Sequence, residues 1–371
     1  MKGVTYWSYI KTEELLSLQG GVDDDESKVN DDEALFIVVH QVYELWFKLV
    51  LRELTSARDL FRLDPVPDHR LASAVRALRR ASTILRQSVS HFDVMETLTT
   101  RDFLAFRDRL VPASGFQSAQ LREIEIVLGQ DDAERIPLGR EGSYLEALKD
   151  DAGKPSPSLS RVERRLADRP TLRDVLEDWL FRTPIDGSQV TSPGDEAAVE
   201  RFLSRFLEAH AREAEHRVAR VDVQAMTRDD VDRLKKRYAD EVEKARAFLF
   251  AEEQADPALR RRERRVRAAL VFVESYRELP LLSWPREVID AVIEVEQAFV
   301  MFRQRHARMV ERVIGRRTGT GGSAGVDYLD QTALRYRIFR NLWAVRTLLV
   351  RESALPPLDH PDHYGFVAGA S

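Results

Sequence analysis

Apolar residues recur along the chain mainly at spacings of three and four, which is the pattern of helices with one buried face. Alternating β-branched residues bounded by turn pairs are scarce, so strands are not expected. The pattern therefore predicts an all-α fold built as a helical bundle. The expected helices cover residues 33–61, 69–95, 287–314 and 328–352, with shorter helical segments flanking residues 112–116.

The helix over residues 33–61 is the clearest of these. Asp31 and Asp32 stand before it and are suitable N-cap residues, whose side chains accept hydrogen bonds from the first backbone N–H groups. Its middle, residues 36–47, is apolar on nearly every side. Because no face of such a helix favours water, we expect it at the centre of the bundle.

The middle third of the chain has a different pattern. Apolar periodicity weakens over residues 130–160, and another Gly- and Pro-containing loop lies at residues 183–195. Amphipathic helices rich in Arg and Glu fill the rest. We expect residues 131–283 to be a helical insertion within a single domain that spans residues 1–371. The Pro-rich residues 355–371 are expected to be a flexible C-terminal tail.

Charge narrows the functional classes. The chain has 371 residues, and 57 Lys and Arg against 62 Asp and Glu give a formal net charge of −5, which does not favour nucleic acid or anionic membranes as partners. The basic run Arg260–Arg265 has no interleaved aromatic residues and is expected to be a solvated helix face. No apolar run of 18 residues occurs, so we expect a soluble cytoplasmic protein without a membrane partner.

The chain contains no cysteine. Disulfides, zinc ribbons, iron–sulfur clusters and thiolate-ligated haem are therefore excluded, and a metal would have to be held by His or carboxylate. Glu213 and His216 form one Glu-x-x-His pair, whereas a carboxylate-bridged di-iron bundle needs two such pairs. The residues Asp359–His363 lie in the Pro-rich tail and are expected to be solvated.

Two of the eight histidines lie on apolar faces of expected core helices. Both stand four residues after a phenylalanine and are followed by apolar residues at helical spacing, in the series Phe36, His40, Tyr43, Phe47 and the series Phe302, His306, Met309, Val313. A single histidine of this kind is more often a core residue than a ligand. Two of them on the two main core helices favour a cofactor, and neutral imidazole in an apolar pocket is how many proteins ligate haem iron.

Two further features suit a small-molecule site. The segment Gly319–Gly325 has four glycines and follows a helix without a Lys, so it resembles a mobile lid or a plain linker more than a phosphate loop. Arg107 lies between aromatic residues and the tight turn at residues 112–118. It is either a surface Arg paired with Asp108 or Glu123, or a guanidinium at the rim of an apolar cavity that can bind a carboxylate.

These motifs, in this order, resemble the tryptophan 2,3-dioxygenase family from residue 5 to about residue 350. The matching segments are Tyr6–Tyr9, Phe36–Lys48, Phe106-Arg107, Pro112–Ser118, Arg303–His306 and Gly319–Ser323. The resemblance implies an all-helical homotetramer with one haem b per chain. It implies an oxidoreductase that cleaves the indole C2–C3 bond of L-tryptophan with O2 to give N-formylkynurenine, in tryptophan catabolism by the kynurenine pathway.

The resemblance also implies a role for single residues. His306 would be the proximal iron ligand, and His40 would accept a hydrogen bond from the indole N–H. The remaining implied roles are as follows: Phe36 packs on the indole, Phe103 and Leu110 line the pocket, Arg107 binds the substrate carboxylate, Thr320 contacts the amino-acid head group, Ser114 and Gly115 lie at the haem, and Tyr6 and Tyr9 enter the neighbouring subunit's pocket.

Three positions depart from the family pattern. Trp7 stands where Gly is common, Phe302 stands where Trp is frequent, and Ala324 replaces a frequent Ser. These departures leave a substituted tryptophan as substrate, or insertion of a single oxygen at C2, as alternatives. A haem-binding protein without turnover is a third possibility, although such a protein has no need of an amino-acid clamp. The sequence does not separate primary catabolism from secondary metabolism.

Overall fold

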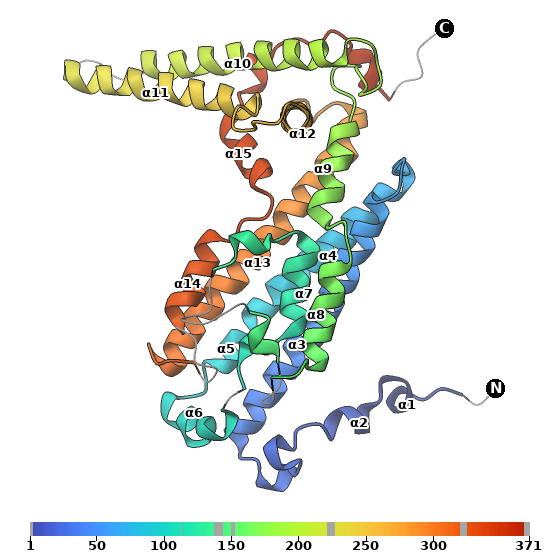
Figure 1. The fold of residues 1–371 in the computed structure, drawn as a ribbon, viewed down its shortest axis with the longest axis vertical. Helices are drawn as coiled ribbons and strands as arrows, with labels where there is room; N and C mark the ends of the chain where they lie inside the picture. The colour runs from blue at the N-terminus through green and yellow to red at the C-terminus, as the bar shows by residue number, and fades with distance from the viewer. Residues whose placement is uncertain are drawn as a thin grey trace. The chain divides into compact units, whose positions relative to one another are not determined.

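The computed structural model of the chain describes residues 3–111, 113–136, 144–149, 153–220, 227–319 and 325–366. Within these ranges the chain forms α-helices and short 3₁₀ turns, and the only β-structure is two isolated bridges (Figure 1). The prediction of an all-α fold is therefore confirmed.

Contacts divide the chain into two compact units. Unit 1 consists of Met1–Ala57, Arg76–Leu172 and Glu294–Ile338, and unit 2 consists of Arg58–Val75, Arg173–Ile293 and Phe339–Ser371. The boundary near residue 172 falls inside the expected insertion at residues 131–283. That these residues form an insertion within one domain stays a prediction.

Unit 1 contains the helices on which the expected site residues lie. They are α1 (Tyr6–Ile10), α2 (Thr12–Leu16), α5 (Phe92–Met95), α6 (Thr100–Arg107), α7 (Ala119–Leu128), α8 (Pro157–Ala167), α14 (Val326–Arg335), and most of α3 (Asp31–Phe61), α4 (Leu71–Ser90) and α13 (Ser283–Ile314). The helix expected at 33–61 is α3, and it begins where Asn30 Oδ1 accepts a hydrogen bond from the Glu33 N–H at 2.8 Å. The helix expected at 69–95 is divided at His91 into α4 and α5.

Helix α8 packs on α7 and supports it within unit 1. The contact is an apolar cluster that includes Ile126 of α7 and Leu159 and Val162 of α8, together with Tyr144 and Leu148 from the segment between them. Ser156 begins α8 by accepting a hydrogen bond from the Leu159 N–H at 3.1 Å. Residues 144–149 and 153–167 therefore support α7.

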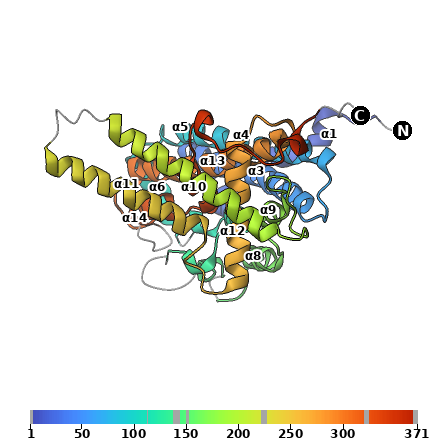
Figure 2. The same ribbon diagram turned by 90° about the horizontal axis from the view of Figure 1, so that it is seen from above.

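Unit 2 is built from α9 (Leu172–Arg182), α10 (Asp195–Arg220), α11 (Arg228–Leu249), α12 (Pro257–Ser275) and α15 (Arg340–Leu348). Helices α10 and α11 lie side by side as an antiparallel pair, as Figures 1 and 2 show. The basic run in α12 is only partly solvated. Arg265 is buried and binds both oxygens of Asp195 at 2.7 Å, so the expectation of a solvated face fails at this residue.

The helix expected over residues 328–352 is wrong, because the chain forms α14 and α15 with a break between them. At the break the Ile338 N–H donates to the Glu296 carboxylate at 2.5 Å, and the Tyr336 hydroxyl accepts from the Ile136 N–H at 3.0 Å. These bonds to distant residues replace the helical pattern of backbone hydrogen bonds.

Part of the expected tail makes specific contacts within unit 2. The buried Tyr364 hydroxyl accepts from the Gly187 N–H at 3.0 Å and donates to the Pro184 carbonyl at 3.2 Å. Asp359 forms an ion pair with Arg205 at 2.8 Å. The tail is thus anchored at Asp359 and Tyr364, while residues 360–363 between them are exposed.

Among the described residues, α3 is the one helix long and apolar enough to cross a membrane by length and composition. Core helices of soluble proteins pass the same test.

Candidate functional site

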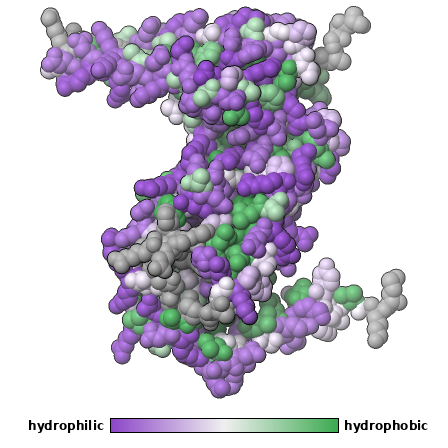
Figure 3. Space-filling model, viewed as in Figure 1, coloured by the Kyte–Doolittle hydropathy of each residue, from purple (hydrophilic) through white to green (hydrophobic). Residues whose placement is uncertain are grey.

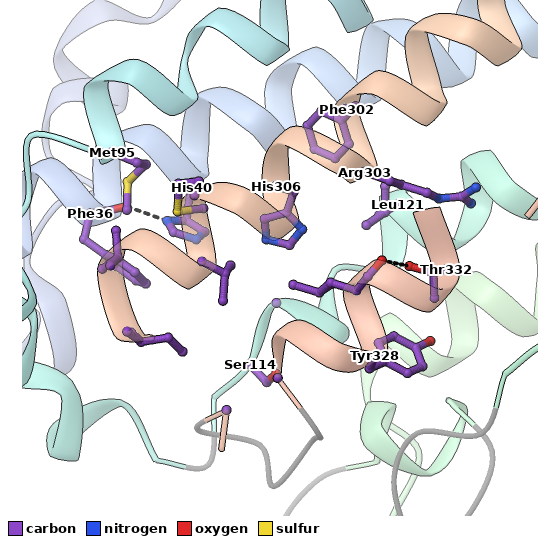
Figure 4. Close-up of a pocket in the computed structure, with 18 of the residues that line it drawn as sticks. Phe36, His40, Met95, Ser114, Leu121, Phe302, Arg303, His306, Tyr328 and Thr332 are labelled. Atoms are coloured by element: carbon purple, nitrogen blue, oxygen red, sulfur yellow. Dashed lines mark hydrogen bonds between the residues drawn. The ribbon is translucent and has the colours of Figure 1, made fainter. Parts of the chain in front are cut away.

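A cavity in unit 1 is lined by residues of α3, α5, α6, α7, α13 and α14 and by the turn at Ser114 and Gly115 (Figure 4). Most of its wall is apolar, formed by Phe36, Met95, Phe103, Leu121, Phe302, Met309, Val310, Val313, Ile314 and Leu329. Such a wall suits a flat apolar molecule.

His40 and His306 both border this cavity, from α3 and α13 respectively (Figure 4). The His40 Nδ1 atom lies 2.7 Å from the Phe36 carbonyl oxygen. Because a carbonyl can only accept, Nδ1 carries the proton, and Nε2 is left as the acceptor. One side of the His40 ring faces the cavity, and protein atoms surround the rest. This burial lowers the pKa of His40. The ring is therefore neutral near pH 7.

His306 has the environment of a metal-binding imidazole. Its ring stacks on Phe92 with the centroids 5.6 Å apart, and it forms no hydrogen bond with any residue that the structure describes. Burial lowers the pKa of His306 to about 4, with smaller contributions from His40 and Arg122. At neutral pH the ring thus offers an unprotonated nitrogen to a ligand.

The described part of the chain does not form a metal site from its side chains alone. The described ranges contain no group of three or more His, Asp or Glu side chains that could hold a metal ion. In the single Glu-x-x-His pair, Glu213 instead binds Arg351 at 2.6 Å. The site accordingly fits a prosthetic group that needs one protein ligand better than it fits a multi-carboxylate centre.

Arg107 borders the same cavity. Its Nη2 atom donates to the Thr318 carbonyl at 2.6 Å, while its buried Nε–H has no acceptor among the described residues. A buried donor without an acceptor is costly, so this side of the guanidinium is suited to bind an oxygen of a ligand. The surface pairing with Asp108 or Glu123, the other reading of the sequence, is not observed between described residues.

Aromatic rings surround the His40 side of the cavity. The Phe36 ring centroid is 4.1 Å from that of His40, 5.8 Å from that of Phe103 and 5.7 Å from that of Phe106. Phe36 and Phe103 thus form an aromatic wall next to His40. Leu110 does not border this cavity.

Leu110 borders a second cavity, which shares Phe36, His40, Phe103, Ser114 and Gly115 with the first. Leu18, Gly21 and Val22 of the N-terminal segment form another part of its wall. The two cavities therefore meet at His40.

Tyr6 and Tyr9 are 74% and 78% exposed and border neither cavity of their own chain. Apolar side chains are visible on this N-terminal segment in Figure 3, and Ile10, Leu15 and Leu16 are among those exposed. Thr320 lies outside the described residues.

A buried charge cluster, which was not predicted from the sequence, lies beside the cavity. Glu125 of α7 accepts hydrogen bonds from Arg122, Arg135 and Arg303 at 2.9, 2.6 and 2.9 Å. Burial raises the pKa of the Glu125 carboxyl, but the three guanidinium charges outweigh it and hold this pKa well below its usual range. Arg135 also binds Asp132 at 2.7 Å, so the three guanidinium groups exceed the two carboxylates by one positive charge, which favours anionic groups at this wall.

A sequence signal for part of this cluster exists. Arg303 stands three residues before His306, so the two share a helix face. Arg122 and Glu125 have the same spacing in α7. The contact between Arg303 of α13 and Glu125 of α7 could not be predicted from the sequence, because it depends on the tertiary fold.

The chain is similar to known proteins over most of its length. Residues 1–349 match the family model described as tryptophan 2,3-dioxygenase. A protein of Sorangium cellulosum named tryptophan 2,3-dioxygenase is 63% identical over 98% of this chain and 88% of its own length. The tryptophan 2,3-dioxygenase 2 of Ralstonia nicotianae is 56% identical over the full length of both chains, and the Xenopus laevis tryptophan 2,3-dioxygenase is 34% identical over 97% of this chain and 86% of its own. The chain belongs to the tryptophan 2,3-dioxygenase family.

Proposed function

We propose that this chain is a haem-dependent enzyme that oxidises L-tryptophan with O2 to N-formylkynurenine, as part of tryptophan catabolism by the kynurenine pathway. The observation that carries the proposal is the placement of His40, His306 and Arg107 around one apolar cavity. The relatives named tryptophan 2,3-dioxygenase favour this reaction over single-oxygen insertion, a substituted tryptophan or haem binding without turnover.

The residues present fit a haem b group. His306, neutral and without a hydrogen-bond partner among the described residues, would hold the iron, and Ser114 and Gly115 would lie beside the macrocycle. The cationic excess at Arg122 and Arg303 would suit its propionates. When bound, haem supplies the redox chemistry by which O2 is activated.

The protein's own part in the reaction is to bind and orient the substrate. His40 Nε2 accepts the indole N–H, which directs C2 and C3 toward the oxidant. Phe36 and Phe103 enclose the ring, and Arg107 binds the carboxylate. Thr320 is assigned to the amino-acid head group and Leu110 to the outer pocket, where it borders the second cavity.

The N-terminal segment is assigned to contact with another subunit. Tyr6 and Tyr9 are exposed and line neither cavity of their own chain, so they would reach the pocket of a neighbouring subunit. We propose that the homo-oligomer is a tetramer. On α3 the side chains of Val38, Leu45 and Leu49 are 44%, 48% and 43% exposed at spacings of seven and four residues. This apolar stripe supports an interface between copies. We assign the enzyme to the cytoplasm, with no nucleic-acid or membrane partner.

The product tests the reaction type. Purified protein loaded with haem, reduced and supplied with O2 and L-tryptophan, should yield a product heavier than the substrate by two oxygen atoms, measured by mass spectrometry. A gain of one oxygen atom would instead support the C2 monooxygenase. No product from L-tryptophan would favour another substrate or the non-catalytic protein.

The two histidines should differ in their effect on haem content. His306→Ala should lose most of the haem Soret absorbance, because the iron loses its protein ligand. His40→Ala should keep the haem and lose activity, because a hydrogen-bond acceptor for the substrate is not needed to hold the macrocycle. The reverse result would exchange the two assignments.

Arg107 should determine whether a substrate needs a carboxylate. Loss of one partner of a desolvated, hydrogen-bonded ion pair costs about 2–5 kcal/mol, so Arg107→Ala should lower kcat/KM for L-tryptophan by roughly 30-fold to several thousand-fold. Arg107→Lys should restore little, because an ammonium lacks the planar pair of donors. Indole, which has no carboxylate, should be a poor substrate that is indifferent to the change. Equal losses for both substrates would mean that Arg107 supports the fold or the haem.

Deletion of residues 1–10 should weaken L-tryptophan binding more than it lowers haem content, since the segment would act on a neighbouring pocket. Titration of the Soret band measures the first quantity and the haem-to-protein ratio the second. Light scattering should show an oligomer for the full chain. A monomer with full activity would contradict the assignment of Tyr6 and Tyr9.

A further inference from the structure

Glu44 lies near His40 and is not part of the substrate or haem contacts proposed above. It stands one turn after His40 on α3, and both residues border the second cavity. Ser118 Oγ donates to one carboxylate oxygen of Glu44 at 2.6 Å, and Gln120 Nε2 donates to the other at 2.7 Å. The Gln120 amide also donates to the Glu44 backbone carbonyl at 2.6 Å. Both oxygens of this carboxylate are therefore fixed.

The two donors belong to the segment that shapes both cavities. Ser118 follows the turn at Ser114 and Gly115 and begins α7, where its Oγ accepts from the Leu121 N–H at 3.3 Å. Within the turn, the Ser114 N–H donates to Gln117 Oε1 at 3.1 Å. Glu44 thus joins the helix that carries His40 to the turn and to the start of α7.

We propose that Glu44 is a positioning residue for the reaction and acts through His40. Its bonds to Ser118 and Gln120 hold the 114–118 turn against α3, so that the indole meets the His40 acceptor atom in one orientation. Its negative charge lies one helical turn from His40 on the same face of α3. The inference rests on the function proposed above.

The charges around His40 define a pH signature. Burial lowers the pKa of His40, while the hydrogen bond to the Phe36 carbonyl and the charge of Glu44 raise it. The other charged or titratable groups that border the two cavities are Glu33 on α3, Arg107 on α6, Arg122 and Glu125 on α7, Arg303 and His306 on α13, and Tyr328 on α14. Protonated His40 cannot accept the indole N–H, so activity should fall on the acid side. Removal of the Glu44 charge lowers the pKa of His40 and moves this fall to lower pH.

The test is the pH profile of kcat/KM for L-tryptophan with haem-loaded enzyme. Glu44→Gln should lower kcat/KM at pH 7.5 by about 5–20-fold and move the acid limb down by about 0.5–1 pH unit. Ser118→Ala, which keeps the charge and removes one donor, should lower kcat/KM by more than about twofold and leave the limb in place. Glu53→Gln is the matched control on α3, because Glu53 binds Arg80 at 2.7 Å and borders neither cavity. It should match the wild type.

A double-mutant cycle separates action through His40 from general support of the fold. In a His40→Ala background, Glu44→Gln should change the L-tryptophan Kd, read from the Soret band without turnover, by less than twofold. The full single-mutant loss there, or an unmoved acid limb in Glu44→Gln, overturns the inference. If Glu44→Gln does not fold, a Ser118→Ala profile identical to the wild type overturns it. If the wild type is active, any of these results overturns only the role of Glu44 and leaves the proposed function intact. An inactive wild type contradicts the proposed function itself.

Discussion

The cavity wall depends on one buried carboxylate. Glu125 holds guanidinium groups from its own helix, from the segment after α7 and from α13, and no other acidic side chain in the described part of the chain accepts from all three. Its loss would remove the carboxylate that three largely buried guanidinium groups share, of which Arg135 would keep its ion pair with Asp132, and this is far more costly than the loss of an exposed pair. The same cluster fixes the distance between α7 and the part of α13 that carries His306. Stability and the geometry of the candidate ligand thus rest on the same ions.

Helix α3 organises the opposite side of the site. Phe36, His40 and Glu44 follow one another at intervals of four residues, so one helix face presents an aromatic ring, an acceptor and a fixed charge. The Glu44 carboxylate is held in place by hydrogen bonds from Ser118 and Gln120, at the start of α7.

Local periodicity explains why the core helices and two of the candidate site residues could be predicted from the sequence. The helices that carry His40 and His306 are long and strongly patterned, so their existence and the faces of both residues were evident. The break between α14 and α15 was not, because it depends on a bond from Ile338 to Glu296, 42 positions away in the chain. Burial of Arg265 by Asp195 likewise requires the packing of α12 against α10. The placement of Leu110 at the second cavity follows from a turn whose path has no periodic signal.

The hydrogen bond between His40 and the Phe36 carbonyl has an evolutionary consequence. Its acceptor is a main-chain atom, supplied by the helix at position i−4 whatever side chain stands there. The choice of tautomer is therefore insulated from substitution at position 36, and the pocket next to it can change its shape and preference without altering which nitrogen carries the proton. Drift in substrate specificity within this architecture can proceed one aromatic residue at a time while the hydrogen-bonding chemistry of the imidazole stays constant.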